Sequence, residues 1–92
     1  MTYYFRDMYI PDRMQDIVDL YVDEGRVPGD FLKAVLVNDL KDAVGRADDE
    51  NIKNIPAYIG YLYNECPGAC WGSKENVIAW VKAKTGQEIT LR

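Results

Sequence analysis

The stretch that decides the fold runs from Pro28 to Arg46 and reads PGDFLKAVLVNDLKDAVGR. It is the longest apolar-rich run in the chain without an internal helix breaker. Its apolar residues recur on a face broad enough to be covered from more than one side. The pattern predicts one buried helix, capped by Asp30 and ended by Gly45, on which shorter amphipathic helices pack.

Asn38 and Asp39 interrupt this run with two polar side chains of poor helix propensity. If they are buried, they need hydrogen bonds, and the carboxylate would pair with Arg46 or another cation. If they face solvent, they need no partner. The periodicity of so apolar a segment does not decide between the two arrangements.

Three further helices are expected around this stretch. They cover residues 12–24, between Pro11 and Gly25; residues 49–63, started by Asp48; and residues 74–85, between Ser73 and Gly86. Pro56 is expected to bend the helix of residues 49–63, and the alternative is that it splits this helix so that Asn54 caps a second segment. The aromatic segment 1–9 should pack on a helix, and pairing with the extended tail 88–92 is an alternative. Residues 1–92 are thus predicted to form a single all-α domain, a compact bundle of four helices with at most a minor extended pairing of the two termini.

The charge of the chain is unevenly spread. Of the 92 residues, positions 1–50 hold twelve of the fifteen Asp and Glu but six of the eleven Lys and Arg. An acidic front half disfavours direct binding to nucleic acid or to an anionic membrane, and it favours a basic protein partner. A chain this short buries a small core, so association into a homo-oligomer would add stability.

Several chemistries are excluded by the residues present. With no histidine, the commonest catalytic base and metal ligand are missing, and nothing sets a nucleophile beside a base. We expect no enzyme and no cofactor. Cys66 and Cys70 lack a second cysteine pair, so zinc would need ligands from other copies, and free thiols are the expectation. The absence of a membrane-length apolar run and of a signal-peptide pattern predicts a cytoplasmic protein.

The expected helix of residues 12–24 carries aspartates on a narrow stripe opposite its apolar face. They are Asp12, Asp16, Asp19 and Asp23, with Glu24 next in the chain. One interpretation is a solvated surface. The other is a row of carboxylates, about one helical turn apart, that binds a basic groove. Like charges four residues apart destabilise a helix by a few tenths of a kcal/mol, so a helix that tolerates them is expected to gain something elsewhere.

Aromatic side chains gather on the expected helix of residues 49–63 and in the loop after it. They are Tyr58, Tyr61, Tyr63 and Trp71. Aromatic rings stack on nucleobases, and Arg46 could meet a phosphate, so these residues form a candidate site that sequesters a small nucleotide signal. Tyrosines at helical spacing are also usual in a core or at its rim, and the sequence leaves both interpretations open.

Short motifs between residues 10 and 82 resemble a group of small accessory proteins of tailed phages and prophages. They are IPDRM (10–14), PGDFLKAVL (28–36), NDL (38–40), RAD (46–48), YLYN (61–64) and CWGS (70–73). The resemblance implies expression in a bacterial host, where many such proteins bind and block a host factor. It suggests an inhibitor of a host defence complex, similar to the small anti-CRISPR proteins, in the host cytosol. A structural or scaffold role in the phage is the remaining alternative.

Overall fold

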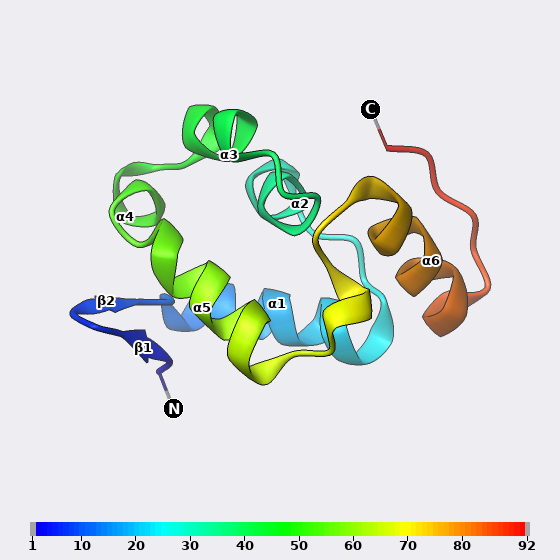
Figure 1. Cartoon of the computed structure of the whole chain (residues 1–92), viewed down its shortest axis with the longest axis horizontal. Coiled ribbons are helices and arrows are strands. Elements are labelled where there is room, and N and C mark those ends of the chain that lie inside the picture. The colour runs from blue at the N-terminus through cyan, green and yellow to red at the C-terminus, as the bar shows by residue number, and fades with distance from the viewer. Residues whose placement is uncertain (1, 92) are drawn as a thin grey trace.

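Six α-helices, one short hairpin and a 3₁₀ turn make up residues 2–91, the part of the chain that the computed structural model describes (Figure 1). The helices are α1 (Asp12–Glu24), α2 (Asp30–Leu36), α3 (Leu40–Arg46), α4 (Asp49–Ile52), α5 (Ile55–Glu65) and α6 (Lys74–Thr85). The hairpin strands are β1 (Tyr4–Phe5) and β2 (Met8–Tyr9), and the 3₁₀ turn is η1 (Gly68–Cys70). The predicted all-α class is confirmed, and two of the four expected helices are each divided in two.

The stretch that decides the fold contains two helices, α2 and α3, where one was expected. Between them, Asn38 has a φ of 65°, a left-handed conformation that asparagine tolerates and an α-helix cannot contain. The carboxylate of Asp39 accepts a hydrogen bond from the backbone N–H of Asp42 at 3.1 Å and so caps α3. The prediction of one continuous helix is therefore wrong. Asn38 and Asp39 are both exposed, as in the second of the two arrangements considered.

Only the first half of this stretch is the buried scaffold expected of it. The buried residues of α2 are Phe31, Leu32, Ala34, Val35 and Leu36. In α3 only Ala43 is buried, whereas Leu40 and Val44 are 66% and 47% exposed. The predicted cap of α2 is also wrong, because Gly29 occupies that position and Asp30 is the first helical residue.

Residues 49–63 were expected to form one bent helix, and that prediction is wrong, because the chain divides there as in the alternative considered, with Asn54 at the N-cap position of α5. Lys53 and Asn54 separate α4 from α5, so Pro56 lies in the first turn of α5, where its missing N–H costs no hydrogen bond. The predicted start is confirmed, since the carboxylate of Asp48 accepts from the backbone N–H of Asn51 at 2.7 Å. The break at Asn54 brings its side chain within hydrogen-bond distance of the hairpin.

The aromatic N-terminal segment folds back on itself as the antiparallel pair β1–β2, with Tyr4 opposite Tyr9. The extended pairing thus lies within this segment, and residues 87–91 form no strand. The hairpin packs on α5, as predicted for a helix. It does so closely: a Cβ added at Gly60 would lie 2.7 Å from Cδ1 of Phe5. Glycine at this position therefore lets the hairpin dock.

Helices α1 and α6 are joined through the backbone of α1. The indole N–H of Trp80 lies 3.2 Å and 3.1 Å from the carbonyl oxygens of Tyr21 and Val22. The fully buried Tyr21 donates its hydroxyl hydrogen to the carbonyl of Cys70 at 2.7 Å. The predicted boundaries of these two helices are confirmed: Gly25 and Gly86 end them in left-handed conformation, and Ser73 caps α6. These contacts hold α1 with one side in the core and the other in solvent.

Candidate functional site

The outward side of α1 carries the acidic stripe that the sequence predicts. Its other side is fixed in the core by Met14, Val18 and Tyr21, which are 8%, 4% and 0% exposed. The acidic face, as it is called below, consists of the exposed Asp12, Asp16, Asp23 and Glu24 and the half-buried Asp19. The packing of α1 thus fixes the spacing and the outward side of the residues that carry these carboxylates.

Asp19 is held by two side chains, one from α1 itself and one from α5. One of its carboxylate oxygens accepts from Nε2 of Gln15 at 3.0 Å and from the hydroxyl of Tyr61 at 2.7 Å. The ring of Tyr61 in turn meets the edge of Tyr3 at a centroid distance of 5.1 Å. Burial, and then this hydrogen bond, raise the pKa of the Tyr61 hydroxyl, so it remains a donor to Asp19.

The other carboxylates of the acidic face have few contacts or none. Asp12 accepts from the hydroxyl of Thr2 at 2.8 Å. Among residues 2–91, no side chain forms a hydrogen bond or an ion pair with Asp16, Asp23 or Glu24. Three exposed negative charges of α1 are therefore without a cation from the described chain.

Two carboxylates of α2 and α3, unlike those of the acidic face, form ion pairs within the chain. The guanidinium of Arg46 reaches Asp30 at 3.1 Å and Asp42 at 3.2 Å, so it joins the ends of the two helices. Lys33 lies 3.4 Å from the other carboxylate oxygen of Asp30. These exposed ion pairs neutralise the charge locally and add modestly to stability.

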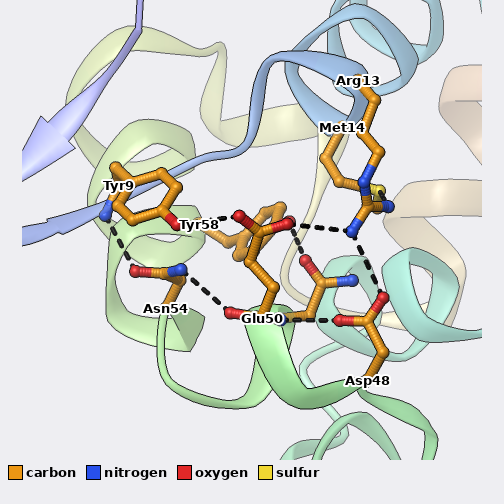
Figure 2. Close-up of polar contacts among 8 residues, drawn as sticks. Tyr9, Arg13, Met14, Asp48, Glu50, Asn54 and Tyr58 are labelled. Carbon is orange, nitrogen blue, oxygen red and sulfur yellow. Dashed lines mark hydrogen bonds and ion pairs between the residues drawn. The ribbon is translucent and has the colours of Figure 1, made fainter.

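A second paired group connects α1 to α4 and the hairpin (Figure 2). The guanidinium of Arg13 lies 3.2 Å from both Asp48 and Glu50, and Glu50 also accepts from the hydroxyl of Tyr9 at 2.8 Å. The pKa of Asp48 is lowered, first by the backbone N–H of Asn51 and then by the charge of Arg13. Asp48 and Glu50 therefore have structural partners.

The residues predicted to bind a nucleotide are not brought together. Tyr58 is 1% exposed, meets the edge of Phe31, and donates its hydroxyl hydrogen to Asn51. Tyr63 is 78% exposed, and Trp71 is half-buried. A core position for Tyr58 agrees with the alternative that the sequence left open.

Arg46 lies apart from those aromatic residues. It lines a hollow of about 380 Å³ together with the carboxylates of Asp30, Asp39 and Asp42, and none of the candidate aromatic residues lines it. Two of these carboxylates already pair with the guanidinium. Their negative charge opposes a phosphate, so the predicted role of Arg46 in nucleotide binding finds no support in this arrangement.

Cys66 and Cys70 are free thiols, half-buried and buried respectively. Burial raises the pKa of Cys66 to about 12 and also raises that of Cys70, so both remain protonated and unreactive near neutral pH. Within residues 2–91, no group of three or more potential ligands is arranged to hold a metal ion. These thiols act as core and rim side chains.

One feature of this surface escaped the sequence analysis. A hollow of about 470 Å³ opens where the hairpin meets the start of α1, and Tyr4, Tyr9 and Asp12 line it. The hollow adjoins the acidic face because Asp12 belongs to both. Its tyrosines come together through the turn at Arg6, whose φ is 58°, and no local pattern of residues 1–9 indicated that turn.

Comparison with protein families, with curated proteins and with solved structures finds no match to this chain. No helix within residues 2–91 combines the length and the apolar character that crossing a bilayer requires. The function is therefore inferred from the arrangement of side chains.

Proposed function

We propose that this protein acts by binding a partner protein that has a basic surface, and that the acidic face of α1 makes the contact. The observation that carries the proposal is the isolation of Asp16, Asp23 and Glu24. They are exposed and lack a cation within residues 2–91, whereas the carboxylates near Arg13 and Arg46 are paired. A partner that supplies the missing cations would relieve the repulsion within the row.

The anchoring of the α1 backbone supports this role. Asp19 is held by Tyr61, and the backbone of α1 is held by Trp80. A helix ordered before binding loses little backbone freedom on association, and a single-sign surface speeds the encounter with an oppositely charged protein. Complementary charge thus favours fast and salt-sensitive association.

The basic surface is, in this proposal, one that normally holds nucleic acid. Carboxylates spaced along a helix can compete with phosphates for the same arginines and lysines. The resemblance to phage and prophage proteins supports a bacterial host complex, with defence complexes as the first class to test. The protein would then inhibit such a complex by occupying its nucleic-acid surface, in the manner of the anti-CRISPR proteins.

The experiment is affinity capture from a bacterial lysate with wild-type protein and a triple charge reversal, Asp12→Lys, Asp16→Lys and Asp23→Lys. Asp19 is left intact because Tyr61 depends on it. A matched control places the same charge change elsewhere, with Asp7→Lys, Asp49→Lys and Glu75→Lys, all three at exposed positions. Mass spectrometry identifies proteins that the wild type and the control retain and the reversal loses.

The proposal predicts that such proteins exist, that they bind nucleic acid, and that added oligonucleotide displaces them. Circular dichroism must show equal helix content in all three proteins. Equal capture by the wild type and the reversal would contradict the proposal, as would equal losses in the reversal and the control. The second outcome would mean that net charge, rather than this face, determines binding.

A further inference from the structure

The hollow beside the acidic face has two walls of different chemistry. It measures about 470 Å³ and is lined by Thr2, Tyr4, Tyr9, Asp12, Arg13 and Glu50. One wall is aromatic and comes from the hairpin, while the other is charged and comes from α1 and α4. Neither wall alone specifies an occupant.

The aromatic wall is a pair of tyrosine rings from opposite strands. Tyr4 and Tyr9 are cross-strand partners, with ring centroids 6.3 Å apart and planes tilted by 50°. Tyr9 is fixed, since its hydroxyl donates to Glu50 at 2.8 Å and its backbone N–H donates to Asn54 at 3.0 Å (Figure 2). Tyr4 is 65% exposed. A tyrosine face attracts a cation, most strongly where water is partly excluded.

The charged wall has a surplus of negative charge. Arg13 is the one cation among the six lining residues named, and its guanidinium is engaged by Asp48 and Glu50 (Figure 2). Asp12 makes no ion pair with residues 2–91 and accepts one hydrogen bond, from Thr2. Asp16 lies one helical turn further along α1. The unpaired charge at the mouth of the hollow is therefore negative.

We infer that this hollow receives an arginine side chain of the basic partner, with the guanidinium against the ring of Tyr4 and hydrogen-bonded to the carboxylate of Asp12. The inference rests on the proposed function and names one contact within it. A planar guanidinium stacks on an aromatic ring and donates to a carboxylate at the same time. The compact ammonium of lysine cannot make both contacts as well. An anionic occupant would meet the unpaired carboxylate of Asp12.

The test uses nuclear magnetic resonance to follow the backbone amides of Tyr4, Tyr9 and Asp12 during titration with a hexaarginine peptide. Hexacitrulline, whose side chains are uncharged, and hexalysine are the matched probes. The inference predicts saturable shifts at these three amides with hexaarginine, weaker shifts with hexalysine and none with hexacitrulline. Amides of the acidic face, such as that of Asp23, report binding to α1 independently of the hollow.

Tyr4→Ala should lower the affinity for hexaarginine about 2- to 5-fold, the range of an exposed cation–π contact. Tyr4→Phe retains the ring and should retain the affinity. Tyr63→Ala removes another exposed tyrosine, 78% exposed, which does not line the hollow, and should change nothing. If Tyr4→Ala unfolds the hairpin, the comparison of hexaarginine with hexalysine on the wild type still tests whether the hollow prefers arginine.

Three results would overturn the inference. Equal shifts at Tyr4 and Tyr9 with hexaarginine and hexalysine would show that charge alone is recognised. Shifts with hexacitrulline of similar size would show that charge is irrelevant there. Shifts at Asp23 without shifts at Tyr4 and Tyr9 would remove the arginine contact while leaving the proposed function in place.

Discussion

Two sets of surface carboxylates differ in what surrounds them: Asp16, Asp23 and Glu24 on α1, and the carboxylates that pair with Arg13 and Arg46. Near α3, one guanidinium, that of Arg46, bridges Asp30 and Asp42 at 3.1 Å and 3.2 Å. Near α4, Arg13 bridges Asp48 and Glu50. On α1, Asp16 has no such neighbour within residues 2–91. The same residue types are therefore structural in one region and free for another use in the other.

This difference teaches that net charge alone does not locate a binding surface. Only the carboxylates without internal partners retain their full attraction for an external cation, because ion pairing within the chain neutralises the rest. The first three predictions test whether the paired region holds the fold together, and their expected effects decrease in the order given. The last measurement compares the paired region with the acidic face.

The largest effect is expected where the paired region meets the core. Tyr58→Phe leaves the buried Oδ1 of Asn51 without its donor. An unsatisfied buried acceptor costs about 1–3 kcal/mol of unfolding free energy. Urea denaturation followed by circular dichroism measures this loss. Tyr63→Phe is the control, because its ring is 78% exposed and should lose almost nothing; equal losses in the two variants would contradict the assignment.

A smaller loss is expected from Asp48→Ala, which removes the cap of α4 and one partner of Arg13. The lowered pKa of Asp48 makes its contribution depend on pH. A depressed folded-state pKa means that the contribution is complete above the unfolded value, about pH 4, and disappears as the pH falls through the folded value. Urea midpoints of wild type and variant should therefore converge towards low pH. A gap independent of pH would contradict the role of the ionised carboxylate.

Arg46→Gln removes the cation shared by Asp30 and Asp42 and should cost about 0.5–1 kcal/mol at low salt. In 1 M NaCl the loss should shrink, because exposed pairs are screened. Arg26→Gln is the matched control: it removes one exposed charge that forms no ion pair with residues 2–91. If the two variants were equally stable, the bridge between α2 and α3 would have no energetic weight.

Much of the fold follows from the sequence, and its failures share a physical cause. The caps at Asp48 and Ser73 and the stops at Gly25 and Gly86 were predicted from local chemistry and are present. Asn38 was not predicted to break a helix, because apolar residues continue at helical spacing on both sides of it. A left-handed residue changes the direction of the chain without changing the apolar pattern.

The candidate site was predictable to a similar extent. Helical spacing alone was enough to predict the acidic face, and the exposure of its residues agrees with the interpretation of a free surface. That Asp19 is held by Tyr61 could not be foreseen, since the two residues are 42 positions apart in the chain. The hollow at Tyr4 and Tyr9 depends on the turn at Arg6 and on the notch at Gly60, which are properties of the folded hairpin.

The measurement that tests the central claim most directly compares the unfolding free energies of two neutralised proteins. One carries Asp16→Asn, Asp23→Asn and Glu24→Gln on the acidic face, and the other carries Asp30→Asn, Asp42→Asn and Asp48→Asn in the paired region. Each loses three negative charges. The first should be as stable as the wild type or more stable by about 0.3–0.5 kcal/mol. The substitutions relieve the repulsion among the carboxylates of α1 and the unfavourable interaction of Asp23 and Glu24 with the negative, C-terminal end of the helix dipole. The second should be less stable than the wild type. A loss of stability in the first as large as in the second would contradict the account, because the carboxylates of α1 would then be structural.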